Sequence, residues 1–151
     1  MRPRRGFSYV ELLVVLTVIG IISRIAVPRM WEVRKRAQSR AAVADVRVIR
    51  DALLSHQTDR GAFPGEAPSG MIPSGLQSFL PAGFAFTRED YTLNYEYWAA
   101  SGPSPAMIGV AVETNDSTLA NEVRKLGASG LPHLLVGTRT VFILSGLDGV
   151  S

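Results

Sequence analysis

Hydrophobic residues are concentrated in one continuous run near the amino terminus. Residues 7–23, FSYVELLVVLTVIGIIS, contain 12 apolar residues in 17. As an α-helix this run would rise about 26 Å, and extending it through residues 25–27 brings it to the ~30 Å thickness of a hydrocarbon core. The pattern therefore predicts a helix over residues 7–28 that is long enough to span a membrane.

The helical pattern continues beyond this run but becomes amphipathic. Apolar residues recur at i, i+4, i+7 and i+11, and they are Ala42, Val46, Ile49 and Leu53. Charged residues occupy the other faces. We expect one helix from residue 7 to about residue 57, with residues 29–60 as its amphipathic part and Pro28 interrupting its hydrogen-bond ladder. A small sheet should cover the apolar stripe.

Residues 61–151 carry the signals of a small α+β domain. Nine of the 23 residues 61–83 are Gly or Pro, which predicts a long loop. Within it, one short helical turn is expected at Leu76, Phe79 and Leu80.

Strand and helix signals follow this loop. Tyr91, Leu93, Tyr95 and Tyr97 alternate with polar residues, which predicts a strand. We interpret this row of tyrosines as sheet packing rather than as a platform for a ligand. Two more strands are expected over 106–112 and 140–144. The sheet should be antiparallel, with three or four strands.

A short helix is expected between the last two of these strands. Its apolar positions lie at i, i+4 and i+7, and they are Leu119, Val123 and Leu126. Asp116 or Ser117 would cap its start, and Gly127 would follow its end.

Composition and charge narrow the possible functions. A chain of 151 residues fits one domain plus an attachment, and with 0 Cys and 2 His it has no disulfides, thiol catalysis or Cys-based zinc sites. The net charge of +3 comes from Arg2, Arg4 and Arg5, because the remaining residues count 13 basic against 13 acidic. The basic isoelectric point is therefore poor support for nucleic-acid binding.

Two features of the apolar run require explanation. A secretory signal peptide would also start basic and apolar, but no small-residue cleavage site follows the run. Glu11 is a carboxylate within apolar surroundings, where a charge costs roughly 2.5 to 3.5 kcal/mol. Either Glu11 lies near the lipid headgroups, or a cation supplied elsewhere pairs with it. A new amino terminus made by cleavage a few residues upstream would supply that cation.

The segment RRGFSYVELLVVLTVIGII resembles the amino-terminal signature of prepilins and pseudopilins, the subunits of type IV pili, type II secretion pseudopili and DNA-uptake filaments. The matching features are a basic leader, Gly6 followed by Phe7, Glu11 five positions into the mature chain, and an unbroken apolar helix. Pro28 falls where the family kinks its long helix. The junction HQTDRGAFP at 56–64 is similar to that of many pseudopilins.

The resemblance implies processing of a leader at residues 1–6. A prepilin peptidase would cut between Gly6 and Phe7 and methylate the amine of Phe7. That amine would pair with Glu11 of a neighbouring subunit or of its own chain, which makes Glu11 a registry device. The implied fold is the pilin-like α+β fold, with a long helix against a small antiparallel sheet.

The resemblance also implies partners and a location. The partners are the prepilin peptidase, other pilin or pseudopilin subunits, an inner-membrane assembly platform and the phospholipid bilayer. The chain would cross the inner membrane once, with its amino terminus in the cytoplasm and residues 61–151 in the periplasm.

The charges of residues 24–40 argue against this orientation. They hold six basic residues against Glu32, a net charge of +5, so the positive-inside rule favours the opposite topology. We rank the motif above this count, because the peptidase must reach the leader from the cytoplasm. The basic stretch is interpreted first as a solvated helix face. Contact with anionic lipid or with acidic residues of a neighbouring subunit comes second, and contact with DNA comes third.

Catalytic and metal-binding readings find little support. His56 and His133 are isolated, with His133 expected in a loop, and the Walker A motif is absent. Glu89, Asp90 and Asp148 lie in polar loop contexts. Some pseudopilins bind calcium in a carboxy-terminal loop, but the loop around Asp148 offers a single carboxylate. We expect no enzyme activity, no metal and no cofactor.

The sequence therefore predicts a structural subunit of a type IV pilin-like filament, with a type II secretion pseudopilin as the first choice. One alternative is a type IV pilus or DNA-uptake pilin. Another is a signal-anchored periplasmic binding protein that does not polymerise. Only the filament subunits should begin at a methylated Phe7.

Overall fold

The structure of the protein, a computed structural model, describes residues 8–99, 107–127 and 130–145. In chain order the elements are α1 (Tyr9–Arg60), the 3-10 helix η1 (Gln77–Phe79), β1 (Thr92–Trp98), β2 (Met107–Glu113), α2 (Ser117–Gly127), β3 (His133–Val136) and β4 (Arg139–Ser145). The chain divides into two compact units, residues 1–34 and residues 35–151, and α1 contributes to both.

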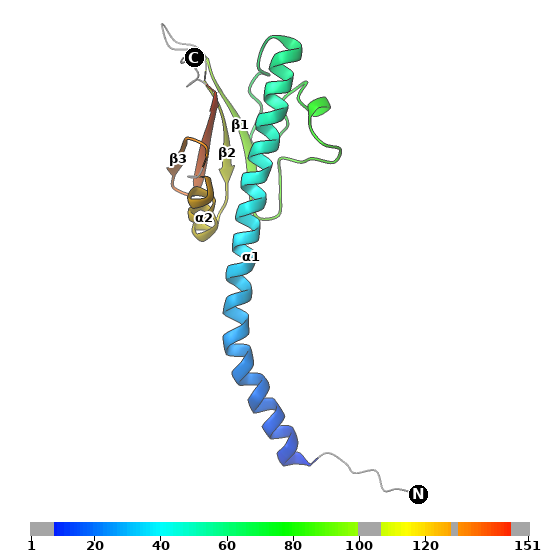
Figure 1. Ribbon diagram of the computed structural model, residues 1–151, viewed down its shortest axis with the longest axis vertical. Coiled ribbons are helices and arrows are strands. Elements are labelled where there is room, and N and C mark those ends of the chain that lie inside the picture. The colour runs from blue at the N-terminus through cyan, green and yellow to red at the C-terminus, as the bar shows by residue number, and fades with distance from the viewer. Residues whose placement is uncertain (1–7, 100–106, 128–129, 146–151) are drawn as a thin grey trace, which may run out of the picture. The chain divides into compact units, whose positions relative to one another are not determined.

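The second unit contains a four-stranded antiparallel sheet with the order β1-β2-β4-β3 (Figure 1). β1 pairs with β2 with Tyr95 opposite Val110, and β2 pairs with β4 with Val110 opposite Phe142. The alternating pattern at 91–97, the apolar run at 106–112 and the segment at 140–144 correspond to β1, β2 and β4. The predicted α+β fold class is confirmed.

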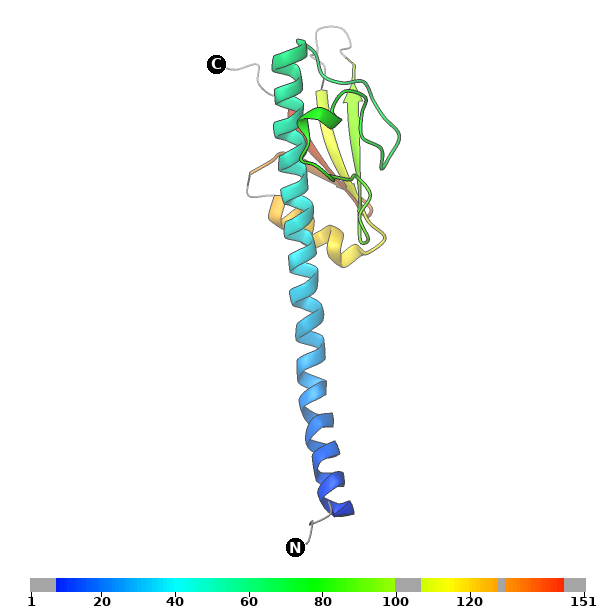
Figure 2. The ribbon, with the colours of Figure 1, turned by 90° about the vertical axis from the view of Figure 1, so that its right-hand side faces the viewer.

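Residues 35–60 of α1 lie along one face of this sheet (Figure 2). The predicted apolar stripe packs there, and its members Ala42, Val46, Ile49 and Leu53 have no exposed surface. They share one core with sheet residues such as Leu93, Val110 and Phe142. Burying each large aliphatic side chain stabilises the fold by roughly 1.5–3 kcal/mol.

The tyrosines of the alternating row at 91–97 pack in or against this core. Tyr95 is fully buried, and its hydroxyl donates a hydrogen bond to the carbonyl of Pro64 at 3.0 Å. Tyr91, just before β1, is also buried. The interpretation of the tyrosine row as sheet packing is confirmed for Tyr91 and Tyr95.

α2 begins with a side-chain cap. The Asp116 Oδ1 atom accepts hydrogen bonds from the backbone N–H groups of Thr118 at 2.8 Å and Leu119 at 3.2 Å, two donors without a partner inside the helix. Of the two predicted caps, Asp116 is the one used. Gly127 is the last helical residue rather than the first beyond the helix.

The expectation that His133 lies in a loop is wrong, because His133 is the first residue of β3. β3 has four residues, too few for a clear alternating pattern. Val136 pairs with Arg139 across a two-residue turn, and Gly137 in this turn has a φ of +63°. A glycine at the first position of a two-residue hairpin turn is a known signal. Once β4 is predicted, Gly137 therefore indicates that a strand precedes it in a hairpin.

The loop at 61–83 contains η1, which confirms the predicted short helical turn. Leu76 and Leu80 on either side of η1 are buried in the core. The loop therefore contributes side chains to the core.

Candidate functional site

The first part of α1 presents apolar side chains on all sides. Its large apolar residues between Tyr9 and Val33 are 46 to 78% exposed. Among the described residues, α1 is the one helix long and apolar enough to cross a membrane, judged by length and composition. A continuous apolar surface of this size requires lipid or other helices to cover it. The helix fits a membrane-anchored protein.

Glu11 lies in the first turn of α1 with its side chain exposed. A carboxylate at this position is favoured by the partial positive charge of a helix amino terminus. It is flanked along the chain by Val10 and Leu12, which are also exposed. Gly6 and Phe7 lie outside the described residues, so both the cleavage site and the pairing of Glu11 with the Phe7 amine stay predictions.

Two other residues of this segment affect its hydrogen-bond ladder. Pro28 lies inside α1, and the helix continues through it although proline lacks an N–H donor. The kink at Pro28 stays a prediction. Thr17 donates its hydroxyl proton to the Leu13 carbonyl at 2.8 Å. Its polar group is thus satisfied within the helix and requires no external partner.

The cations that follow the apolar run have different surroundings. Lys35 forms an ion pair with Asp116, and the hydrogen bond from Lys35 is the main cause that lowers the pKa of the Asp116 carboxyl. The five arginines of residues 24–40 are exposed, and they are Arg24, Arg29, Arg34, Arg36 and Arg40. Among the described residues, Lys35 is the one of these six cations that forms an ion pair.

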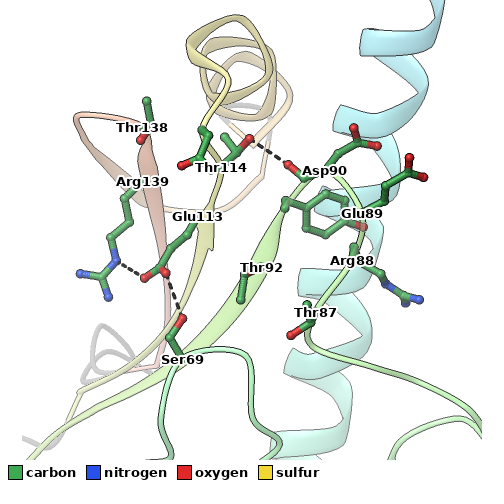
Figure 3. A pocket seen from close by; sticks show the side chains of 12 residues that line it. Ser69, Thr87, Arg88, Glu89, Asp90, Thr92, Glu113, Thr114, Thr138 and Arg139 are labelled. Atoms are coloured by element: carbon green, nitrogen blue, oxygen red, sulfur yellow. Dashed lines mark hydrogen bonds and ion pairs between the residues drawn. The ribbon is translucent and has the colours of Figure 1, made fainter.

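A polar cavity of about 650 Å³ opens where β1 begins, β2 ends and β4 begins (Figure 3). Glu113 projects into it, accepts a hydrogen bond from the Ser69 hydroxyl at 2.9 Å and lies 2.9 Å from Nε of Arg139. Arg139 also pairs with the buried Glu96. The positive charge of Arg139 is thus balanced by one carboxylate from β1 and one from β2.

Another wall of the cavity is attached to α1 through Asp45. The Asp45 carboxylate accepts a hydrogen bond from the Tyr91 hydroxyl at 2.8 Å and forms an ion pair with Nε of Arg88 at 3.1 Å. Burial, and then the hydrogen bond to Asp45, raise the pKa of Tyr91, so its hydroxyl stays a proton donor. Nearby, the Gln38 amide donates to Asp90.

These cavity contacts were not predicted from the sequence. Asp45 lies 43 residues from Arg88 and 46 residues from Tyr91. In the sequence, Asp45 looks like a solvated acid on the polar side of an amphipathic helix, and no local motif predicts which residues it contacts. The sequence indicates only that Glu89 and Asp90 are loop acids, although both line the cavity.

The two histidines have structural surroundings. His56 is buried, its Nδ1 atom lies 2.9 Å from the Ala62 carbonyl, and its ring meets Phe79 edge-on. His133 Nδ1 lies 2.9 Å from the Leu131 carbonyl. Among the described residues, no group of three or more His, Asp or Glu side chains could hold a metal ion. Asp148, the acid of the carboxy-terminal loop, lies outside them.

Comparisons with curated proteins find relatives at modest identity. The chain is 26% identical over 95 residues to the type II secretion system core protein G of Klebsiella pneumoniae, covering 63% of this chain and 61% of the relative. It is 30% identical over 79 residues to the protein of the same name in Escherichia coli, covering 52% and 50%. The chain thus spans about half to three fifths of the length of these two relatives.

A third relative is covered more completely. The type IV wide pilus major component PilA4 of Thermus thermophilus is 29% identical over 114 residues, which cover 74% of this chain and 82% of the relative. No family model matches the chain. No solved structure matches it either.

Proposed function

We propose that the chain, which is similar to pilin and pseudopilin subunits, is a structural subunit of a thin filament, and specifically a type II secretion pseudopilin. The observation that carries the proposal is the first part of α1, an apolar helix exposed on all sides with Glu11 in its first turn. Such a helix can be stored in a bilayer and then transferred into a bundle of like helices.

In this proposal, a prepilin peptidase removes residues 1–6 and methylates the new amino group of Phe7. This amine carries a positive charge, and it can pair with the Glu11 carboxylate within the apolar surroundings. An unpaired charge in an apolar bundle is costly while a paired one is tolerated, so pairing favours one axial offset between neighbouring helices. Further helix packing would then hold the subunit in the filament.

The proposed partners are the prepilin peptidase, further pilin or pseudopilin subunits, an assembly platform in the inner membrane and the bilayer. The proposed topology is a single pass, with the amino terminus in the cytoplasm and the second compact unit (residues 35–151, called the sheet domain below) in the periplasm. This function requires no catalytic step by the chain and no cofactor. The expectation that the loop around Asp148 binds no calcium stays a prediction.

A pilus subunit is the second candidate, and a specific observation favours it. The Thermus thermophilus relative aligns over 82% of its length, whereas the two secretion-system relatives align over 61% and 50%. Identity is similar in all three comparisons. The two candidates share the same processing and the same helix-driven assembly, so they differ in the machine that the filament serves.

Mass spectrometry of the amino terminus tests the proposal. The full chain is produced in a bacterial host with and without a prepilin peptidase, and the membrane-extracted protein is analysed intact. We expect loss of residues 1–6 and a methyl group on Phe7 only when the peptidase is present. A solitary chain that keeps Met1 in both hosts would instead indicate the signal-anchored binding protein.

A second experiment tests the role of Glu11. Glu11→Ala should be cleaved as the wild-type chain is but should leave filaments greatly reduced in a sheared-cell pellet. Glu66→Ala, which removes an exposed acid of the sheet domain, is the matched control and should assemble normally. Normal filaments from Glu11→Ala would disprove the registry role while leaving the subunit assignment intact.

A further inference from the structure

The charge of the chain is divided between two parts. Residues 24–60 of α1 contain nine basic and four acidic residues, a net charge of +5. Residues 61–151 contain four basic and eight acidic residues, a net charge of −4. Each part therefore carries the charge that would attract the other part of a second copy.

Part of the exposed positive charge of the second unit lies on one face of α1. Arg36, Arg40 and Arg47 follow one another at i, i+4 and i+11, which places them on one side of a helix. We call these residues the arginine stripe. All three are exposed, and among the described residues neither Arg40 nor Arg47 forms an ion pair. The hydrogen bond from Lys125 is the main cause that lowers the pKa of Glu122 in α2, and the charge of Arg36 is the smallest cause.

The uncompensated negative charge borders the polar cavity. Arg88 and Arg139 in the cavity wall are already paired, with Asp45 and with Glu96 and Glu113 respectively. Asp90 accepts a hydrogen bond from the neutral amide of Gln38, and Glu89 is exposed with no ion pair among the described residues. We call Glu89 and Asp90 the acidic wall. Figure 3 shows both on the side of the cavity next to α1.

The arginine stripe and the acidic wall lie on opposite sides of α1. Asp45 faces the acidic side, because it pairs with Arg88 next to Glu89. Arg47 follows two residues later, and two residues turn an α-helix by about 200°. One copy therefore cannot bring its own stripe to its own acidic wall. A second copy can, and such a contact joins different surfaces of two identical chains.

We propose that the arginine stripe of one copy docks against the acidic wall of the next, so that the sheet domains join head to tail. This inference rests on the proposed filament function and deepens it. A contact between different surfaces of identical chains, repeated without closure, generates a filament rather than a dimer. The charges select the neighbour and its register, while the apolar helices supply the burial.

Cysteine cross-linking in the full chain tests the contact directly, because the chain contains 0 Cys. Arg47→Cys and Glu89→Cys are introduced together, and cells producing filaments are oxidised with copper phenanthroline. We expect a ladder of multimers from the double variant and only dimers when two single-cysteine chains are mixed. The control pair, Arg47→Cys with Glu66→Cys, should give no ladder.

Charge exchange supplies a second readout that misfolding would not imitate. Arg47→Glu or Glu89→Arg alone should reduce the assembled fraction about tenfold, and the two together should restore it to within about twofold. Arg124→Glu, at an exposed arginine of α2 outside the stripe, should assemble normally. Raised salt should reduce the assembled fraction of the wild-type chain, because it screens the charges of the two surfaces.

The outcomes separate this contact from the proposed function. If the wild-type chain forms filaments but the Arg47→Cys, Glu89→Cys double variant gives no ladder above the control pair, the head-to-tail contact alone is overturned. A wild-type chain that never assembles would overturn the proposed function and this contact with it. If Arg47→Glu leaves assembly unchanged but abolishes binding of DNA or of vesicles containing anionic lipid, the stripe serves that ligand and the contact is wrong.

Discussion

Residues 9–34 and residues 35–60 belong to the same helix, yet their apolar side chains have different surroundings. Ile19 in the first part is 53% exposed, whereas Ile49 in the second part is completely buried. In the first part apolar residues occupy every face, so one sheet could not cover them. In the second part they form one stripe, and the chain's own sheet covers it. The first part therefore needs partners outside the chain, and the second does not.

The largest expected effect comes from truncating the same residue type in the two parts. Ile49→Ala should lower the free energy of unfolding of the sheet domain by about 2–5 kcal/mol, because it leaves a cavity in the core. Ile19→Ala should leave that free energy unchanged. Urea unfolding of the full chain in detergent, followed by tryptophan fluorescence and circular dichroism, measures both. Equal effects of the two variants would contradict the division of α1.

A pair of glycines sharpens the same comparison. A Cβ atom at Gly127 would lie 2.3 Å from Cε1 of Phe142, whereas one at Gly20 would meet nothing within 4 Å. Gly127→Ala should therefore destabilise the domain by about 1–3 kcal/mol through overpacking. Gly20→Ala should raise the helix stability by up to about 1 kcal/mol. Thermal unfolding in detergent checks both variants. The midpoint should fall for Gly127→Ala and should rise or stay the same for Gly20→Ala.

An effect of similar size is expected at the link between Asp45 and Tyr91. Tyr91→Phe keeps the buried ring but removes the hydrogen bond to the carboxylate, which should cost about 1.5–3 kcal/mol. In the wild-type chain the raised pKa of Tyr91 means that the folded state disfavours its phenolate. This contribution to stability is complete below the ordinary pKa of tyrosine and is lost as the pH rises above it.

Unfolding measured between about pH 8 and pH 11, a range that brackets the ordinary pKa of tyrosine, tests this link. Wild-type stability should fall at the alkaline end more steeply than that of Tyr91→Phe. Tyr9→Phe, in the first part of α1, is the matched control and should keep the wild-type profile. Identical alkaline slopes for wild type and Tyr91→Phe would show that the hydroxyl is not linked to folding.

The smallest effect concerns the cap of α2. The pKa of Asp116 is lowered chiefly by the hydrogen bond from Lys35, so its contribution to stability is present above the ordinary pKa of aspartate. It is lost as the pH falls through the lowered value. Asp116→Asn keeps a good cap and removes the charge, so the cost should be at most about 1 kcal/mol at neutral pH and should vanish in acid. Urea unfolding at neutral and at acidic pH checks this; a cost that persists in acid would point to the cap instead.

Much of this protein is determined by short-range patterns in the sequence. The apolar run and the stripe from Ala42 to Leu53 predict α1, because periodicity and length are local properties of a chain. β1, β2, β4 and α2 follow from the same kind of signal. The leader, Phe7 and Glu11 are also features of a continuous segment, which is why their proposed roles can be stated without coordinates.

The tertiary structure alone decided the features that join distant segments. β3 was missed because four residues carry too little pattern, and it is defined only by its pairing with β4. The ion pairs of Asp45 with Arg88 and of Arg139 with Glu96 depend on residues far apart in the chain. Likewise, the arginines of α1 can be counted in the sequence, but only the packing of the helix on the sheet shows which of them have no ion pair among the described residues. Charges act through space, so their partners are fixed by the fold rather than by neighbouring residues.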